Sequence, residues 1–117
     1  MKYTIDAADK KIGRIASEAA AILMGKKSTS FAKNNVENVK VEIINAKRVY
    51  VTAKKKAGGV GDDYVRYTGF RGGIKSQTLG EVIEISGMKR VFELAVYSML
   101  PKNKLRAPRL KNLTVKE

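Results

Sequence analysis

Residues 39–44 read Val-Lys-Val-Glu-Ile-Ile, and this stretch decides the fold because it is the strongest strand candidate in the chain. It is dominated by β-branched residues, whose side chains favour strands. Residues 2–6 alternate polar and apolar side chains and predict an earlier short strand. Between the two, residues 13–24 carry apolar side chains at helical spacing and predict a helix. Strand, helix and strand in succession form a βαβ unit, so we expect parallel pairing through a right-handed crossover.

The segment after this unit is predicted to be less regular. Residues 48–52 predict a further strand, and residues 54–63, rich in lysine and glycine, predict an exposed loop. Residues 64–68 predict a short extended segment that enters a glycine-rich stretch, Arg66–Lys75. That stretch holds three glycines. Each would cost about 1 kcal/mol in a helix, so we predict a loop there.

The last third of the chain predicts a second helical region over residues 76–100. Thr78 is placed to cap its beginning, Gly87 is expected to break it, and Pro101 is expected to end it. Residues 112–115 predict a last short strand.

Length and composition restrict the classes of protein. A chain of 117 residues predicts one domain, residues 1–117, with a globular core (residues 1–100) and a basic tail (residues 101–117). No apolar run approaches the roughly 18 residues of a membrane span, and the first residues lack the apolar core of a secretion signal, so we expect neither a membrane protein nor a secreted one. The chain has no cysteine and no histidine. Their absence excludes disulfides and thiolate metal sites and removes the commonest general base, so we predict no enzyme activity and no cofactor.

Positive charge is the strongest compositional feature. The net charge is +13, from 24 lysines and arginines against 11 acidic residues. Residues 47–75 carry a net charge of +6 and residues 99–117 carry +5. Because a domain this basic repels itself, charge concentrated in two segments predicts a surface for a polyanionic partner.

The glycine-rich stretch Arg66–Lys75 has the composition of a nucleic-acid contact. It reads Arg-Tyr-Thr-Gly-Phe-Arg-Gly-Gly-Ile-Lys, with three cations and two aromatic residues. Glycines allow the backbone to approach a sugar-phosphate chain closely, and the cations can neutralise phosphates. Tyr67 and Phe70 can either stack on bases or pack in the core, and the sequence leaves both alternatives open. The preceding run Lys54–Lys56 predicts a cationic arm beside this loop.

Two further segments lie where small-nucleotide binding motifs could occur. Residues 25–28 (Gly-Lys-Lys-Ser) resemble part of a phosphate-binding loop, but they close a predicted helix instead of opening one, so we interpret them as a helix C-cap. Residues 6–13 hold a single glycine, Gly13, which we expect to allow close helix–sheet packing and not dinucleotide binding. The positive charge of Arg14 lies in the first turn of the predicted helix, where the helix dipole disfavours cations. The sequence leaves two roles open for Arg14: contact with an anionic group of RNA, or a surface cation without a partner. The pair Asp62-Asp63 is expected only to solubilise the chain.

Several segments together resemble the large-subunit ribosomal protein thirteen family. The resemblance is carried, in order and at matching spacing, by residues 5–7, 12–17, 23–27, 41–46, 49–52, 67–75 and 95–103. The chain departs from the family at Ser98, where glycine is usual. The resemblance implies a three-layer α/β/α fold around a mostly parallel four-stranded sheet. It also implies a structural component of the large ribosomal subunit, in the cytoplasm, that binds large-subunit rRNA and supports early assembly beside neighbouring ribosomal proteins.

Matching segments place Arg14, the Gly72-Gly73-Lys75 loop and the Pro101-Lys102 region at or near RNA, and charge adds the remaining candidates. The predicted RNA-binding residues are Arg14, Lys26, Lys27, Lys54, Lys55, Lys56, Arg66, Tyr67, Arg71, Gly72, Gly73, Lys75, Lys102, Lys104, Arg106, Arg109 and Lys111. Residues 101–117 are expected to become ordered only on RNA. No membrane and no small-molecule substrate is expected. A free-standing RNA-binding regulator or chaperone on the same scaffold is the main alternative function, and a nucleotide-dependent α/β enzyme is a second, disfavoured one.

Overall fold

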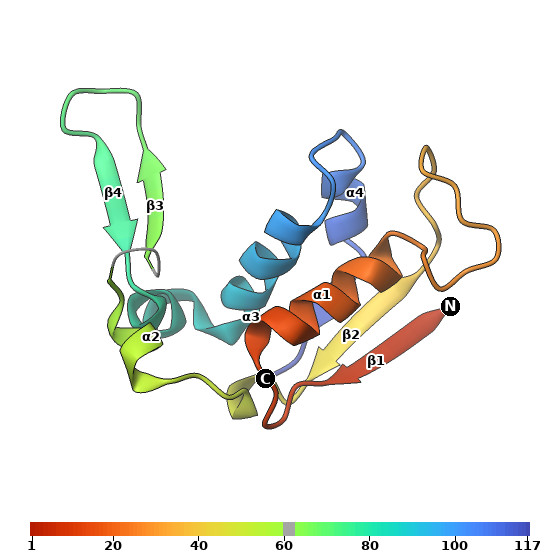
Figure 1. The fold of residues 1–117 in the computed structure, drawn as a ribbon, viewed down its shortest axis with the longest axis horizontal. Coiled ribbons are helices and arrows are strands. Elements are labelled where there is room, and N and C mark those ends of the chain that lie inside the picture. The colour runs from red at the N-terminus through yellow and green to blue at the C-terminus, as the bar shows by residue number, and fades with distance from the viewer. Residues whose placement is uncertain (60–62) are drawn as a thin grey trace.

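Helices and strands alternate along the part of the chain that the computed structural model describes, residues 1–59 and 63–117 (Figure 1). The elements in chain order are β1 (Lys2–Asp6), α1 (Ile12–Leu23), β2 (Lys40–Ile44), the 3-10 helix η1 (Ala46–Arg48), α2 (Ala53–Ala57), β3 (Tyr64–Tyr67), β4 (Ile74–Gln77), α3 (Leu79–Met99), α4 (Arg106–Leu110) and β5 (Leu113–Val115). The predicted α/β class is confirmed, because helices pack around a parallel sheet.

The body of the protein is built on this sheet, with strand order β1-β2-β5 and both pairs parallel. The register aligns Ile5 with Ile43 and Ile43 with Val115. β1, α1 and β2 form the predicted βαβ unit. In the described residues this sheet has three strands, not the four that the resemblance implied, and β3 and β4 form a separate antiparallel pair.

The strand predicted over residues 48–52 is wrong. η1 occupies the start of this range, and Tyr50 makes an isolated parallel bridge to Lys11. The reason lies just before it, where Asn45 adopts a left-handed conformation with φ of 57° and turns the chain out of β2. The Asn45 amide also donates a hydrogen bond of 2.9 Å to Asp6, which ties the ends of β1 and β2 together.

One charged residue, Glu42, is buried in the central strand, with 7% of its surface exposed. Lys116, just after β5, forms an ion pair with one carboxylate oxygen, and Lys2 on β1 lies 2.6 Å from the other. The hydrogen bonds from these two ammonium groups lower the pKa of Glu42 to about 2, and the bond from Lys116 has the larger effect. Because Lys2 lies on β1 and Lys116 directly follows β5, the two ion pairs tie both flanking strands to β2.

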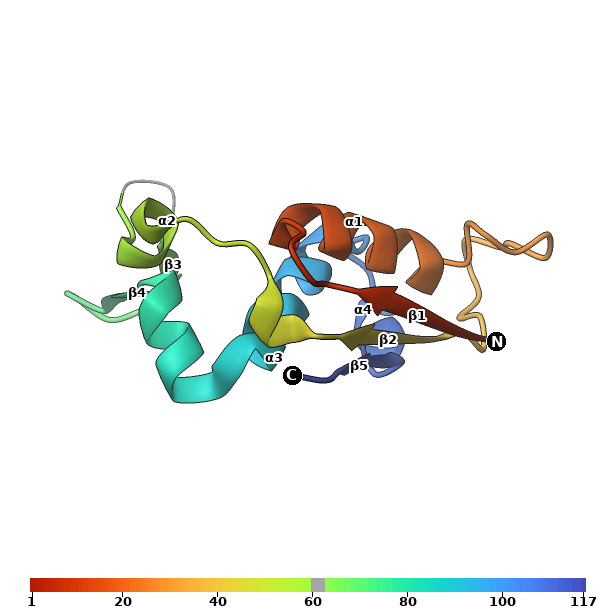
Figure 2. The ribbon, with the colours of Figure 1, turned by 90° about the horizontal axis from the view of Figure 1, so that it is seen from below.

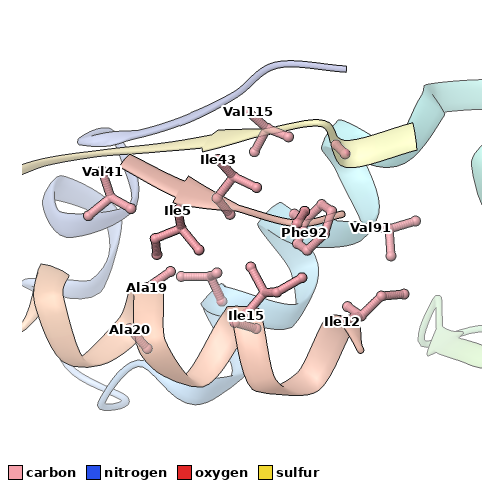
Figure 3. Close-up of a cluster of buried hydrophobic side chains, with 14 of the residues drawn as sticks. Ile5, Ile12, Ile15, Ala19, Ala20, Val41, Ile43, Val91, Phe92 and Val115 are labelled. Atoms are coloured by element: carbon pink, nitrogen blue, oxygen red, sulfur yellow. The ribbon is translucent and has the colours of Figure 1, made fainter. Parts of the chain in front are cut away.

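The core lies between the sheet and the helices α1 and α3 (Figure 3). α1 lies over the sheet (Figure 2) with its apolar stripe buried, and α3 packs against α1. Ile43 and Phe92 are completely buried at the centre of this cluster. The other labelled core residues are Ile5, Ile12, Ile15, Ala19, Ala20, Val41, Val91 and Val115.

α1 ends as its sequence predicts, at a glycine cap. Gly25 has φ of 82°, its N–H donates to the Ile22 carbonyl at 2.9 Å, and the Lys26 N–H donates to the Ala21 carbonyl at 3.1 Å. This pair of bonds defines a Schellman motif and confirms the C-cap interpretation. The role predicted for Gly13 is wrong, since a Cβ there would meet nothing within 4 Å.

α3 consists of two helical halves joined by a kink. Thr78 caps the first half in a reciprocal capping box with Glu81, as the sequence predicted for the cap. Gly87, with φ of 74° and ψ of 178°, interrupts the helix as predicted. The second half begins at Met88, whose N–H donates to the Glu117 side chain at 3.2 Å. The ammonium of Lys47, and after it the Met88 N–H, lower the pKa of Glu117.

The elements α2, β3 and β4 form an arm that projects from one end of the molecule, whose longest dimension is 46 Å (Figures 1 and 2). The predicted loop over residues 54–63 is wrong for its first part, because α2 extends to Ala57. Thr52 starts this helix by accepting a hydrogen bond of 3.3 Å from the Lys55 N–H. Residues 60–62, including Asp62 of the predicted solubilising pair, lie outside the described residues.

The C-terminal segment, residues 101–117, contains regular structure, and its dependence on RNA stays a prediction. α4 and β5 both lie within residues 101–117, and β5 matches the strand predicted over residues 112–115. The Val41 N–H donates to the Asn112 carbonyl at 2.9 Å, and the Lys116 N–H donates to the Ile43 carbonyl at 2.8 Å. Backbone pairing with the central strand therefore holds this segment to the body.

Candidate nucleic-acid interface

The glycine-rich stretch forms the end of the β3–β4 hairpin. The Thr68 N–H donates to the Gly73 carbonyl at 3.0 Å, and the Gly73 N–H donates to the Phe70 carbonyl at 3.0 Å, so the end is a compact turn. Gly72 has φ of 66°, which favours glycine. A Cβ at Gly73 would lie 2.8 Å from the Phe70 carbonyl oxygen. Sequence reasoning predicted a loop here, but it missed β4 and the hairpin that the glycines close.

The hairpin presents its cations and two of its aromatic side chains to solvent. Arg66, Arg71 and Lys75 are exposed. Tyr67 is 65% exposed and Phe70 is 78% exposed, so neither side chain holds the hairpin to the core. The stacking role that the sequence left open is therefore sterically available to both.

Tyr64 is the aromatic residue that attaches the base of the hairpin to the body. It packs against the buried cluster, and burial raises the pKa of its hydroxyl. Of the three aromatic residues in this region, the one nearest the body serves packing and the two nearer the hairpin end face solvent.

Lys54, Lys55 and Lys56 lie on α2 at the base of the hairpin, and all three are exposed. α2 contacts the first half of α3, where the Gly80 backbone approaches the Lys56 carbonyl. The structure thus brings together, on the arm, the lysine run and the cations of the hairpin (Figure 1).

A cleft of about 750 Å³ separates the hairpin from α3. Arg66 and Lys75 line it from the hairpin, and Arg90 lines it from the second half of α3. Sequence reasoning missed Arg90, because only the folding of the hairpin beside α3 makes it part of this surface. Arg90 also lies 3.5 Å from Glu93, one turn along the helix.

A second cationic surface follows the end of α3. A depression of about 420 Å³ is lined by Tyr97, Lys102, Asn103, Lys104, Arg106 and Ala107. The Arg106 guanidinium lies 4.2 Å from the centre of the Tyr97 ring, and its Nε donates to the Pro101 carbonyl at 3.3 Å. Stacking on Tyr97 holds this half-buried guanidinium in the wall of the depression that Lys102 and Lys104 also line.

The remaining candidates fall outside both surfaces. Arg14 is exposed in the first turn of α1, and Lys26 is exposed just after the end of that helix. Lys27 lies 5.8 Å from the centre of the Tyr3 ring and 3.8 Å from Glu18. Lys111 is exposed at the end of α4.

Arg109 requires a correction, because it is only 2% exposed. Its Nη2 donates to the backbone carbonyls of Lys33 at 3.4 Å and Asn35 at 3.2 Å. The guanidinium therefore holds the segment before β2 against α4 and does not face solvent. In the sequence it looked like the other tail cations, and only its burial separates it from them.

Residues 1–59 and 63–117 contain no group of three or more acidic, histidine or cysteine side chains that could hold a metal ion. Among the helices of these residues, none is long and apolar enough to cross a membrane.

Comparison with known proteins gives one consistent result. The sequence model of the family "Ribosomal protein L13" matches residues 1–117. A relative from Rickettsia akari (strain Hartford), named large ribosomal subunit protein uL13, is 40% identical over 113 residues, which cover 97% of this chain and 73% of the relative. The protein of the same name from Orientia tsutsugamushi (strain Boryong) is 38% identical over 111 residues, covering 95% of this chain and 69% of the relative.

The match spans the βαβ unit, the arm and the C-terminal segment alike, so it does not depend on any one motif. The resemblance seen in the sequence is confirmed, and the chain belongs to the ribosomal protein L13 family.

Proposed function

We propose that this protein is a structural constituent of the large ribosomal subunit, that it binds large-subunit rRNA directly through the arm, and that it supports early subunit assembly. The observation that carries the proposal is the β3–β4 hairpin. Arg66, Arg71 and Lys75 are exposed on it, beside two exposed aromatic side chains, at an end of the molecule that contributes little to the core.

Family membership supports the ribosomal part of this proposal. The relatives are named as large-subunit ribosomal proteins, and a protein of this family is a structural component in the ribosome of the cytoplasm, not an enzyme.

The physical mechanism is positioning by charge and shape. Lysine and arginine side chains replace the counterions that surround phosphates, and an arginine fork can bridge two phosphate oxygens. Tyr67 and Phe70 can stack on unpaired bases or ribose rings. The depression beside Tyr97, with Lys102, Lys104 and Arg106, supplies a second contact on the body. Because contacts of this kind are to RNA alone, they need no other protein in place and suit an early step of assembly.

The experiment compares two double variants that remove the same charge. Arg71→Ala with Lys75→Ala removes two cations from the hairpin. Lys33→Ala with Lys40→Ala removes two exposed cations at the opposite end of the molecule, in the segment before β2 and at its start (Figure 1). Binding to a large-subunit rRNA fragment is measured over a range of salt concentrations.

The hairpin variant is expected to flatten the plot of log K against log salt by up to about 1 unit per lost phosphate contact, whereas the control variant should change the slope little. Equal slopes for wild type and hairpin variant would show that these side chains do not touch phosphate. Co-sedimentation of the wild-type protein with large subunits through a high-salt wash distinguishes a structural constituent from a free-standing regulator, which would be released.

A further inference from the structure

The kink of α3 at Gly87 joins two helical halves that begin at separate caps (Figure 2). The first half begins at the Thr78 capping box, and the second begins at Met88, whose N–H is bound by a side chain from elsewhere in the fold. Gly87 lies between them with φ of 74° and ψ of 178°. Because glycine has the widest choice of backbone dihedrals, the kink by itself does not fix the angle between the two halves.

The two halves belong to different parts of the molecule. The first half, residues 79–86, contacts α2 and belongs to the arm (Figure 1). The second half, residues 88–99, belongs to the body, where Phe92 lies in the core (Figure 3). The cleft of about 750 Å³ spans the kink, since Arg66 and Lys75 line it from the arm and Arg90 lines it from the second half. The angle at Gly87 therefore sets where the cations of the arm lie relative to the body.

Glu117 is the side chain that the fold places at the kink. Its Oε1 accepts a hydrogen bond of 3.2 Å from the N–H of Met88, directly after Gly87. Its Oε2 lies 3.0 Å from the ammonium of Lys47 on η1. A carboxylate at the start of a helix satisfies an N–H group that has no partner within the helix, and it complements the helix dipole. One side chain thus caps the second half of α3 and joins it to η1.

The glycine at the kink leaves the space that this carboxylate occupies. A Cβ at Gly87 would lie 2.6 Å from the Glu117 Oε1, so a side chain there would displace the carboxylate. The backbone that carries Glu117 is held as well. The Lys116 N–H donates to the Ile43 carbonyl at 2.8 Å, and the Ala46 N–H donates to the Lys116 carbonyl at 3.2 Å. The carboxylate therefore reaches the kink from a fixed position at the edge of the sheet.

The hydrogen bond to Met88 matters more here than the ion pair with Lys47. The Lys47 side chain is 71% exposed, and ion pairs of exposed groups contribute little to stability. Met88 is buried, and an N–H group that loses its partner at a buried residue carries a cost in free energy. Loss of the carboxylate would therefore loosen the start of the second half, directly at the kink.

We propose that Glu117 is a positioning residue, which caps the second half of α3 beside Gly87 and thereby fixes the angle between the arm and the body. The hairpin cations and Arg90 are then held on the two sides of the cleft before any RNA binds. The consequence for RNA rests on the proposed function: a preset arm does not have to be ordered during binding, so less affinity is lost.

Distances between arm and body in the RNA-free protein test the positioning role. The chain has no cysteine, so Ile74→Cys on the hairpin and Ser98→Cys on the second half of α3, both exposed, can carry two spin labels. Pulsed electron paramagnetic resonance should give one narrow distance distribution for the labelled parent. Glu117→Ala should broaden it, whereas Glu117→Gln should keep it narrow, because the amide oxygen still accepts from Met88. Glu84→Ala, which removes an exposed carboxylate from the first half, is the matched control and should leave the width unchanged.

Amide hydrogen exchange distinguishes loosening of the kink from loss of the fold. Exchange at Met88 should speed up at least about tenfold in Glu117→Ala, while exchange at Phe92 in the core stays that of wild type. Glu117→Asp, whose side chain is one methylene too short to reach the N–H, serves the same comparison if the alanine variant does not fold. A parent distribution that is already broad, or equal widths for parent and Glu117 variants, would overturn the proposal.

Binding to an rRNA fragment tests the consequence for function. Glu117→Ala and Glu84→Ala add the same charge, so their affinities are compared with each other. Glu117→Ala should bind at least about threefold more weakly than Glu84→Ala, with the same slope of log K against log salt, because no phosphate contact is lost. Equal affinities would refute the consequence for RNA. Failure of the wild-type protein to bind the fragment would refute the proposed function, whereas the distance measurement, which needs no RNA, would still decide the positioning role.

Discussion

The substitution Val115→Ala tests whether the C-terminal segment is part of the folded body without RNA. Val115 is 9% exposed and pairs with Ile43 in the central strand. Truncation removes two buried methyl groups, at about 0.8 kcal/mol each, and the cavity left behind adds up to about 1 kcal/mol. We therefore expect the free energy of unfolding to fall by about 2 kcal/mol. For a domain of this size, that loss lowers Tm by roughly 8 °C.

The assay is urea or thermal unfolding of the RNA-free protein, followed by circular dichroism. Thr114→Ala is the matched control, because Thr114 lies on the same strand and is exposed. Its effect should stay within about 0.5 kcal/mol. If Val115→Ala were as stable as wild type, β5 would not be packed on β2 in the free protein, and the reasoning that joins this segment to the body would be refuted.

Three further predictions concern acid stability, the kink in α3 and a glycine in the first turn of α1. Because the pKa of Glu42 is lowered to about 2, below its ordinary value of 4.5, the ionised carboxylate stabilises the fold fully above about pH 5, and this contribution is lost as the pH falls toward 2. Glu42→Gln should therefore flatten the pH dependence of urea unfolding between pH 5 and 2, and a dependence identical to wild type would contradict the role of Lys2 and Lys116. Gly87→Ala should destabilise the protein by about 1–3 kcal/mol, since φ of 74° with ψ of 178° is a conformation open essentially only to glycine. Gly13→Ala, in a regular and unobstructed helical position, should stabilise it by up to about 1 kcal/mol, and shifts of the same sign in thermal melts of the two variants would contradict this assignment.

The sequence predicted the elements whose signals are local. The apolar stripe of α1, its glycine cap at Gly25, and the Thr78 cap and Gly87 break of α3 each depend on residues within about one turn of the helix. β1 and β2 were predictable for the same reason, because each strand shows its own pattern. The basic character of the arm was visible as well, since charge is a property of composition.

The tertiary structure alone decided which of these residues meet. β4 consists of exposed residues without apolar alternation, so nothing in its own sequence marked it as a strand. Only its backbone pairing with β3 identifies it as one. Asn45 turned the chain away from the strand predicted over residues 48–52.

Contacts between distant residues separated side chains that look alike in the sequence. Arg109 and Arg106 both belong to a basic segment, yet Arg109 is buried against the Lys33 and Asn35 carbonyls whereas Arg106 stacks on Tyr97. Glu42 is a strand carboxylate like many others until Lys2 and Lys116 are brought to it from the flanking strands. Local propensity acts over a few residues, but burial and ion pairing depend on neighbours many residues away, and only the completed fold supplies those neighbours.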